Sequence, residues 1–421
     1  MVANGTALVG FALPAHPGYC GGMMAEPNRK TAERPLPEAL DIDMDYLRRV
    51  MLRLLEHHSP TGYTDQVVHV VVEELNALGI EHELTRRGAI RASLQGSRRA
   101  PDRAIVAHLD TIGAMVCGLK PNGRLAVTPI GTWSARFAEG ADVTVLTEEG
   151  ARSGTILPLK SSGHAFDTEV DSQPVSWDNV ELRLDELVHD REGLEAMGVA
   201  IGDFVGVHSN PTITDSGFVK GRHLDDKAGV AVLLAACKAV VETGARLPVD
   251  CHPLFTISEE VGVGASGVLH QDVAELVAID TAPQAPGQAS IETSVTISMK
   301  DSSGPFDWHL NRLLLGLARE NAIDHVRDVF RFYRCDAAAA LEAGNDIRVS
   351  LVCFGTDATH GYERTHLSSL EGLAKLLTAY MQSYPAVERD TQQLGPPKGF
   401  PSQPEEEADF HAFQKAERAA E

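Results

Sequence analysis

The stretch AIVAHLDTIGAM (residues 104–115) decides the fold class. Its apolar run has the character of a buried strand and stops at His108 and Asp110, two side chains that are costly to bury. In open α/β sheets, ligands bind beyond the carboxyl ends of the strands. A strand that ends at a histidine and an aspartate therefore predicts a sheet edge that carries chemistry.

Helical and strand-like patterns alternate on both sides of this stretch. Helical spacing of apolar residues and short apolar runs mark the two kinds of element. The predicted helices span residues 44–58, 64–79, 227–243, 307–321 and 367–382, and the predicted strands span 80–84, 89–94, 103–110, 253–258, 275–280, 289–300, 326–333 and 347–354. This alternation predicts an α/β fold, in which a mixed sheet is flanked by helices.

The segment 118–222 has a different texture, with strands punctuated by Gly and Pro and no long helix. We expect it to form a small inserted β-rich domain. Residues 41–117 and 223–385 then form the catalytic domain. The polar ends, residues 1–40 and 386–421, are expected to be a disordered leader and an acidic disordered tail.

Composition limits the possible partners. Lys plus Arg is 37 and Asp plus Glu is 59 in the 421 residues, which gives a formal net charge of −22. This excess repels nucleic acid and anionic membrane surfaces. No apolar run approaches the roughly 20 residues of a membrane span. The 6 cysteines form no C-x-x-C pair, so we expect a soluble protein of the reducing cytoplasm.

Acidic residues and histidines follow several of the predicted strands. The candidates are His108, Asp110, Asp225, Asp226, Glu259, Glu260, Asp280, Asp357, His360 and His366. Nitrogen and oxygen donors without thiolates suit zinc, cobalt or manganese. Asp225, Glu260 and Asp280 supply about −3 against +4 from two divalent ions, and a bridging hydroxide brings the sum to about zero. The charge balance indicates two metal ions.

Each of these motifs taken alone has a simpler interpretation. His108 and Asp110 could be a hydrogen-bonded pair at a strand end, Glu259–Glu260 a solvated turn, and Asp225–Asp226 a helix N-cap. Their joint position after strands favours the metal site. The glycines of GVGVGASG also match the dinucleotide fingerprint G-x-G-x-x-G. Two glutamates directly before them would face a pyrophosphate, so this alternative is disfavoured.

The order H-x-D, D-D, E-E, D and H resembles the dinuclear zinc aminopeptidases and carboxypeptidases. Within that group, HLDTIG, GRHLDDKAG, EEVGVGAS, AIDTA and FGTDA resemble the tetrahedral (TET) aminopeptidase family, with glutamyl and deblocking aminopeptidases among its relatives. The similarity extends over residues 45–383. LTEEGARSGTI and EAMGVAIGDFV resemble the dimerisation domain of that family.

The resemblance implies a ligand set for two metal ions. His108 and Asp280 would bind one ion, Glu260 and His366 the other, and Asp225 would bridge both. His360 competes with His366, and THLSS (residues 365–369) favours His366 because it resembles the family's His-Ser motif.

The resemblance also implies roles around the metals. Glu259 would be the general base, Asp110 would orient His108, and Asp226 would form a cis peptide with Asp225. Asp357 is a candidate for binding the α-amine of the substrate.

The resemblance implies a metallo-aminopeptidase with two divalent ions, zinc being favoured over cobalt or manganese, assembled from dimers into a homo-oligomer such as a dodecamer. ATHGYERTH (residues 358–366) resembles a branch associated with the osmoprotectant N-acetylglutaminylglutamine amide, which implies a small peptide-amide substrate. Two alternatives stay open. One is a dinuclear-metal amidohydrolase that acts on an acylated or amidated dipeptide, and the other is a metal-stabilised interaction protein without catalysis.

Overall fold

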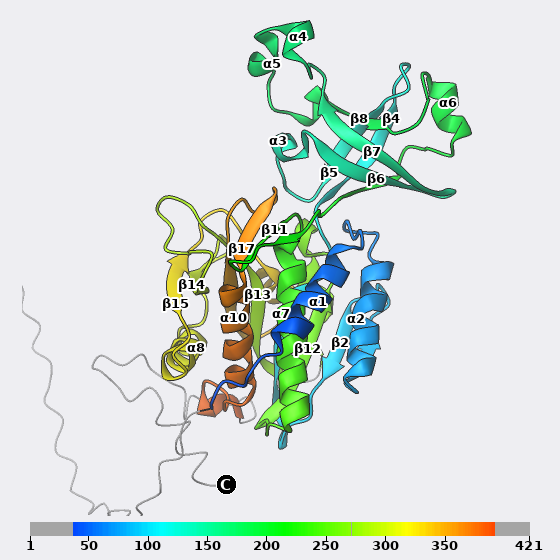
Figure 1. The fold of residues 1–421 in the computed structure, drawn as a ribbon. Helices are drawn as coiled ribbons and strands as arrows, with labels where there is room; N and C mark the ends of the chain where they lie inside the picture. Colours follow the sequence, from blue (N-terminus) through cyan, green and yellow to red (C-terminus); the bar gives the residue numbers. More distant parts are fainter. Residues whose placement is uncertain (1–36, 271, 392–421) are drawn as a thin grey trace, which may run out of the picture. The chain divides into compact units, whose positions relative to one another are not determined.

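The computed structural model of the chain describes residues 37–270 and 272–391 (Figure 1). The leader expected up to residue 36 and the tail expected from residue 392 lie outside the described residues. The described residues extend beyond the expected catalytic domain, residues 41–385, at both ends. Ala39 donates its N–H to Asn321 Oδ1 at 2.6 Å. Val387 is buried, and Arg348 forms an ion pair with Asp390.

The centre of the fold is an eight-stranded mixed sheet, as predicted. Its four middle strands, β12, β3, β13 and β16, are parallel, and antiparallel pairing joins β2 to β12 and β14 to β16. Across the sheet the order is β1 (Glu81–Leu84), β2 (Ile90–Ser93), β12 (Val249–Thr256), β3 (Arg98–His108), β13 (Val273–Pro283), β16 (Arg348–Thr356), β14 (Val295–Lys300) and β15 (His325–Val329). Because the four middle strands run the same way, their carboxyl ends meet at one edge of the sheet.

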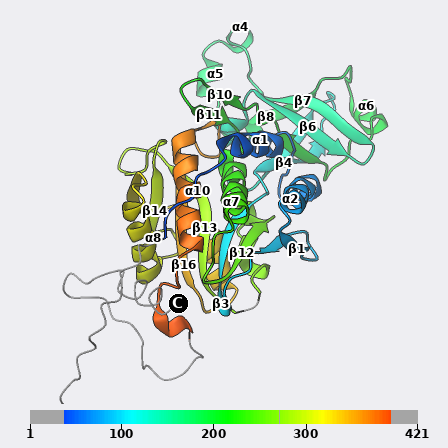
Figure 2. The ribbon, with the colours of Figure 1, turned by 60° about the horizontal axis from the view of Figure 1, so that its bottom comes forward.

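Helices flank the sheet. They are α1 (Met44–Leu55), α2 (Asp65–Ala77), α7 (Leu224–Thr243), α8 (Trp308–Glu320), α9 (Asp336–Glu342) and α10 (Leu367–Met381). Both α1 and α10 pack against α7, which in turn contacts β3 and β13 (Figure 2). The seven-residue α9 was not predicted, because DAAAALE is too short to show a helical period.

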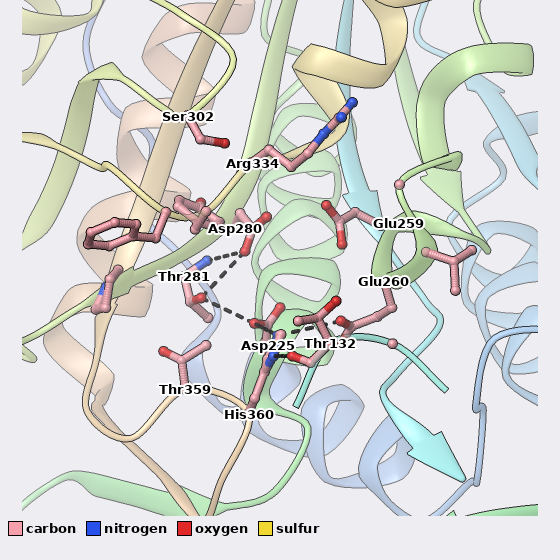
Figure 3. A pocket seen from close by; sticks show the side chains of 16 residues that line it. Thr132, Asp225, Glu259, Glu260, Asp280, Thr281, Ser302, Arg334, Thr359 and His360 are labelled. Carbon is pink, nitrogen blue, oxygen red and sulfur yellow. Dashed lines mark hydrogen bonds and ion pairs between the residues drawn. The ribbon is translucent and has the colours of Figure 1, made fainter. Parts of the chain in front are cut away.

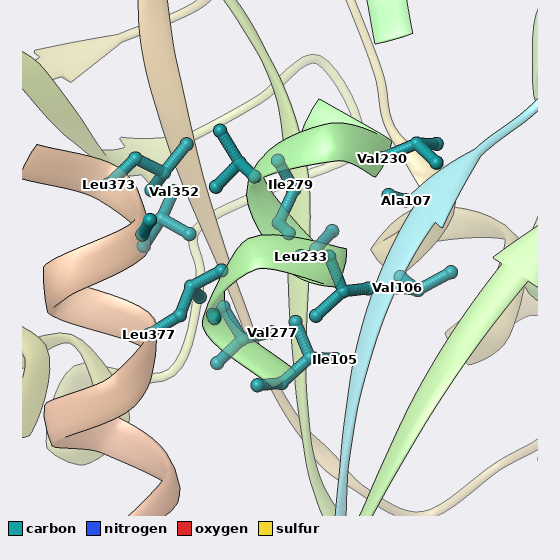
Figure 4. Packing of buried hydrophobic residues seen from close by; sticks show 14 of the residues in the cluster. Ile105, Val106, Ala107, Val230, Leu233, Val277, Ile279, Val352, Leu373 and Leu377 are labelled. Carbon is teal, nitrogen blue, oxygen red and sulfur yellow. The ribbon is translucent and has the colours of Figure 1, made fainter. Parts of the chain in front are cut away.

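The main apolar core lies between α7, α10 and the sheet. Leu233 of α7 lies against Ile105 of β3 and Val277 of β13, while Leu377 of α10 faces the same layer (Figure 4). All four side chains are fully buried. Almost the whole of α7 is buried, which explains why its sequence is apolar around most of its circumference.

The inserted segment forms a closed six-stranded barrel with an apolar core of its own. Around the barrel the strands are β4 (Gly113–Leu119), β5 (Leu125–Ile130), β8 (Val180–Leu184), β7 (Gly150–Pro158), β6 (Ala141–Thr147) and β9 (Phe204–Val207). The short helices of this part are α3 (Ala135–Ala138), α4 (Gly163–Phe166), α5 (Glu169–Ser172) and α6 (Arg191–Ala196), with one 3-10 turn, η1 (Trp177–Asn179). The predicted β-rich character of the insert is confirmed.

The expected limits of the insert, 118 and 222, need correction. The first barrel strand already begins at Gly113. At the other end, β10 (Thr212–Ile213) and β11 (Phe218–Gly221) form a three-stranded sheet with β17 (Glu363–His366), far along the chain. Pairing between strands far apart in the chain leaves no pattern in the local sequence. The sequence therefore predicted β10 and β11 to belong to the inserted domain, because their segment is punctuated by Gly and Pro like the barrel strands before it.

Three further 3-10 turns complete the described chain, namely η2 (Glu259–Val261), η3 (Gly264–Gly267) and η4 (Glu388–Thr391). Across the described ranges, no helix is both long and apolar enough to cross a membrane.

Candidate metal centre

The carboxyl edge of the four parallel strands gathers the predicted site residues. His108 is the last residue of β3, and Asp280 lies near the end of β13. Glu259 and Glu260 form the turn η2 after β12, and His360 lies in the turn between β16 and β17. The strand-end rule thus explains why residues far apart in the sequence share one site.

Asp225, at the start of α7, lies next to two of these side chains. Ligand atoms of His108, Asp225 and Asp280 all lie within 4.8 Å of one another. His108 Nε2 is 3.1 Å from Asp225 Oδ1. The three residues are buried, and Thr281 donates its backbone N–H to Asp280 Oδ1 at 2.6 Å, which orients that carboxylate.

The other oxygen of Asp225 points to a second group. His360 Nε2 lies 3.5 Å from Asp225 Oδ2 and 3.4 Å from Glu260 Oε2 (Figure 3). The N–H of Ile112 donates to Glu260 Oε1 at 3.1 Å and fixes this glutamate. Asp225 is therefore shared between a group with His108 and Asp280 and a group with Glu260 and His360.

Backbone carbonyls fix the orientation of both histidines. His108 Nδ1 is 2.9 Å from the carbonyl oxygen of Asp110, and His360 Nδ1 is 2.8 Å from that of Thr132. A carbonyl can only accept, so each Nδ1 carries a proton, and in the neutral ring each Nε2 has the lone pair. That lone pair points toward the carboxylates, as a metal ligand requires.

His366 lies outside this cluster, so the preference for His366 over His360 is corrected. Its Nε2 is 2.9 Å from the carbonyl oxygen of Ser216, and its Nδ1 accepts the N–H of Ser368 at the start of α10. Both ring nitrogens are already used. The alternation of β17 explains the placement, because Glu363 and Thr365 face inward and His366 lies on the other face against Phe218.

Asp110 supports the site, although not as expected. Its carboxylate accepts the backbone N–H groups of Glu259 at 3.0 Å and Glu260 at 3.3 Å, and the hydroxyl of Thr61 at 2.6 Å. The expected contact to His108 Nδ1 is long, 3.7 Å from Oδ1, and the carbonyl of Asp110 makes the closer one. The Asp110 side chain therefore holds the turn that carries the two glutamates.

Of the remaining two predicted residues, Asp226 lies beside the cluster and Asp357 does not. The Asp225–Asp226 peptide bond is cis, as the resemblance implied. Asp226 Oδ2 accepts the N–H of His108 at 3.2 Å. Asp357 is exposed, its backbone pairs with Arg364, and it does not line the cavity beside the cluster.

Two buried acids were missed by the sequence reasoning. Glu363 accepts the N–H of Asp225 at 3.1 Å and that of His360 at 3.0 Å, and so joins both groups of the site. Asp336, at the start of α9, accepts the hydroxyl of Thr256 at 2.5 Å and the N–H of Ala265 at 2.7 Å. Glu363 lies well past the strand predicted at 347–354, and Asp336 follows the strand predicted at 326–333 but was not among the candidates. The acid before a run of alanines could only have indicated the start of a helix.

Burial disfavours the charged form of several carboxylates in the cluster. Burial, followed by repulsion from Asp225, raises the pKa of Glu260 to about 7 and that of Asp280 well above its ordinary value. Burial also raises the pKa of Glu259 well above its ordinary value, and that of Glu363 to about 8. Each of these groups would be stabilised in its charged form by a nearby cation.

The donor set fits a divalent metal. It contains imidazole nitrogens and carboxylate oxygens and no thiolate, which suits zinc, cobalt or manganese. Asp226 Oδ1 is buried beside the cluster without a hydrogen-bond partner. The cluster opens into a cavity of about 800 Å³, which Glu259 and His360 both line (Figure 3). Fold and site together define an α/β metallohydrolase.

The chain belongs to the M42 glutamyl aminopeptidase family, because the sequence model of that family matches residues 88–376. It is 39% identical over 326 residues to YhfE of Bacillus subtilis, which carries a provisional aminopeptidase name, and the match covers 77% of this chain and 94% of YhfE. It is 27% identical over 222 residues to the lysyl aminopeptidase of Pyrococcus furiosus, covering 52% of this chain and 61% of that protein.

Solved structures share the fold. A TET aminopeptidase from a marine-sediment thaumarchaeote superposes with a TM-score of 0.73 at 19% identity, covering 80% of this chain and 96% of that one. The TET1 peptidase of Pyrococcus horikoshii gives 0.70 at 22%, covering 80% and 99%. The predicted resemblance to the TET family and the predicted class of metallo-aminopeptidase hydrolase are confirmed.

The competition between the two histidines can be tested by metal binding. We expect His360→Ala to weaken zinc binding at least about tenfold, because a ligand atom beside Asp225 and Glu260 is lost. The control His366→Ala should bind zinc as the wild type does, although loss of its N-cap contact should cost about 1 kcal/mol of stability. Zinc per chain after equilibrium dialysis gives the first quantity and thermal unfolding the second. Loss of zinc only in His366→Ala would restore His366 as the ligand.

The raised pKa values predict the pH dependence of the metal-free protein. Glu260 titrates at about 7 and Glu363 at about 8 when folded, against an ordinary value of 4.5. Their stabilising contribution is complete below about pH 4.5, declines as the unfolded chain ionises, and is lost once the pH passes about 8. We expect the free energy of unfolding to fall between about pH 5 and 8.5 in the presence of a chelator, and to fall less with zinc. Urea titrations at each pH measure it, and a rise with pH would contradict the assignment.

Proposed function

We propose that the protein is a two-metal aminopeptidase in which Glu259 is the general base. The observation that supports this most is the place of Glu259. Its Oε2 lies 3.9 Å from His108 Nε2, its side chain is 13% exposed, and it lines the cavity beside the ligand cluster. A base must reach both the ligand cluster and the substrate, and this position allows it.

In this proposal His108, Asp225 and Asp280 hold one divalent ion, and Asp225, Glu260 and His360 hold the other, with zinc favoured. His360 takes the place that the family resemblance implied for His366. Two ions bound there would supply a hydroxide nucleophile at neutral pH and would polarise the scissile carbonyl. The two groups share Asp225, which fits its proposed position as the bridging ligand.

Glu259 performs the proton transfers. It takes a proton from the attacking water and returns that proton to the nitrogen of the leaving amine. The C–N bond breaks, one water is consumed, and a free amino acid and a shortened peptide leave. Burial raises the pKa of Glu259, which suits a group that must both accept and donate a proton.

Surrounding residues hold Glu259 in place. Asp110 accepts the N–H of Glu259, and Thr61 donates its hydroxyl to the other oxygen of Asp110. Asp336 ties the same loop to β12 through Thr256 and Ala265. We propose that these are positioning residues, which act through the orientation of Glu259.

A panel of short substrates tests the reaction and the two alternatives together. With zinc, cobalt or manganese added, we expect hydrolysis of free-amine dipeptides and of leucine p-nitroanilide. Glu259→Gln should lower kcat by about 100- to 10,000-fold, because the base is lost while the ligands remain. Glu195→Gln, an exposed glutamate of α6, is the control with the same chemical change.

The outcomes separate three kinds of protein. Turnover only of N-acetylated or amidated dipeptides would replace the aminopeptidase by the osmolyte amidohydrolase that the ATHGYERTH motif implied. Metal binding with no turnover of any substrate would leave the non-catalytic interaction protein. A Glu259→Gln variant with full activity would remove Glu259 as the base.

We also propose that the chain assembles into a homo-oligomer through the barrel. Two large apolar side chains of the insert are open to solvent, Leu187 at 96% and Ile201 at 65% exposed. One of the similar TET structures is a dodecamer. Mass photometry of the full chain should show species larger than a monomer, and Leu187→Asp with Ile201→Asp should shift them toward the monomer. A monomeric wild type would overturn this proposal.

A further inference from the structure

One basic side chain stands out in the catalytic cavity. Among the described residues that line it are four carboxylates, Asp225, Glu259, Glu260 and Asp280, and one residue, Arg334, that is an arginine or lysine. The carboxylates belong to the proposed metal and base positions. Arg334 belongs to neither. It forms an ion pair with Glu342, and its other N–H donors are available to a ligand.

The fold holds Arg334 in this wall of the cavity. It lies in the segment between β15 and α9, two residues before Asp336, whose carboxylate anchors α9 to Thr256 and Ala265. On the other side, the carbonyl of Tyr333 accepts the N–H of Ser302 at 3.0 Å. The segment is therefore fixed at both ends, next to the loop that carries Glu259.

The guanidinium keeps donors for a substrate. One nitrogen donates to Glu342 Oε2 at 2.7 Å, and the side chain is still 39% exposed. Arginine has five N–H donors in a planar fork that matches a carboxylate. The hydrogen bond to Glu342 raises the pKa of Arg334, and the charges of Asp301 and Glu259 raise it further, so the cation is permanent.

The position of Arg334 indicates which end of a substrate it meets. It lies on the side of Glu259, whereas His360 and Thr359 lie on the opposite side of the cavity (Figure 3). In the proposed reaction Glu259 protonates the leaving amine, so the residue that follows the scissile bond lies on this side. The charge of Arg334 is thus available to a group one residue beyond that bond.

We infer that Arg334 binds the C-terminal carboxylate of a short peptide, which makes dipeptides with free ends the preferred substrates of this site. The inference rests on the proposed aminopeptidase function. A cavity of about 800 Å³ is within the size range of small-ligand sites, which suits a dipeptide.

The test compares Leu-Gly with Leu-Gly amide, which differ only in the carboxylate. We expect the wild type to prefer Leu-Gly. Arg334→Gln should lower kcat/KM for Leu-Gly about 10- to 100-fold more than for the amide, mainly through KM, because a charged hydrogen bond is lost. Arg331→Gln, an exposed arginine of the same segment outside the cavity, is the matched control. Thermal unfolding checks that each variant is folded.

A binding measurement keeps the inference testable without turnover. Calorimetry on zinc-loaded Glu259→Gln protein should show tighter binding of Leu-Gly than of its amide, and this difference should vanish when Arg334→Gln is added. Failure of the aminopeptidase proposal would appear separately, as absence of turnover of leucine p-nitroanilide as well.

Two outcomes would overturn the inference. Equal losses of kcat/KM for Leu-Gly and its amide in Arg334→Gln would show that Arg334 does not bind this carboxylate. A loss confined to glutamate p-nitroanilide, with leucine p-nitroanilide as its comparison, would assign Arg334 to an acidic N-terminal side chain instead.

Discussion

The convergence of buried carboxylates at one edge of the sheet is the constraint on which the rest of the structure depends. Four parallel strands bring Asp280, Glu259 and Glu260 together, and α7 adds Asp225. Burial raises the pKa of most of these acids, so without a cation the site is stabilised by protonation. A divalent metal offers the alternative of keeping the carboxylates charged. The net charge of the site, rather than any single residue, is the reason that a divalent ion fits there.

The inserted barrel also takes part in the site. The loop after β5 places the carbonyl of Thr132 against His360 Nδ1, which leaves Nε2 free toward Asp225 and Glu260. The barrel therefore contributes to the site itself, because one of its backbone groups orients the ring of a proposed ligand. Glu363 of β17 supports the same histidine from the catalytic side. A change in the barrel could alter metal binding without touching any side chain of the cluster.

Around the cluster, regular secondary structure and short hydrogen-bonded segments position different residues. The strands and α7 fix the proposed ligands, whereas Asp110 and Asp336 hold the loop of Glu259 through hydrogen bonds. The same Asp336 anchor holds the segment of Arg334. The proposed base and the proposed substrate contact are thus both anchored by one buried acid, Asp336, which would couple the geometry of catalysis to that of substrate binding.

The sequence by itself determined the α/β class and most helices and strands, because apolar periodicity acts locally. The position after a strand also brought His108, Glu259, Glu260 and Asp280 together as candidates. Sequence reasoning failed where the answer depended on contacts between distant segments. The pairing of β11 with β17 turns His366 outward, and the turn before β17 brings His360 inward. Glu363 and Asp336 carry no local signal of their burial beside the site. Tertiary structure alone decided these positions, because a side chain's partner across a sheet or a cavity is set by packing and not by its neighbours in the chain.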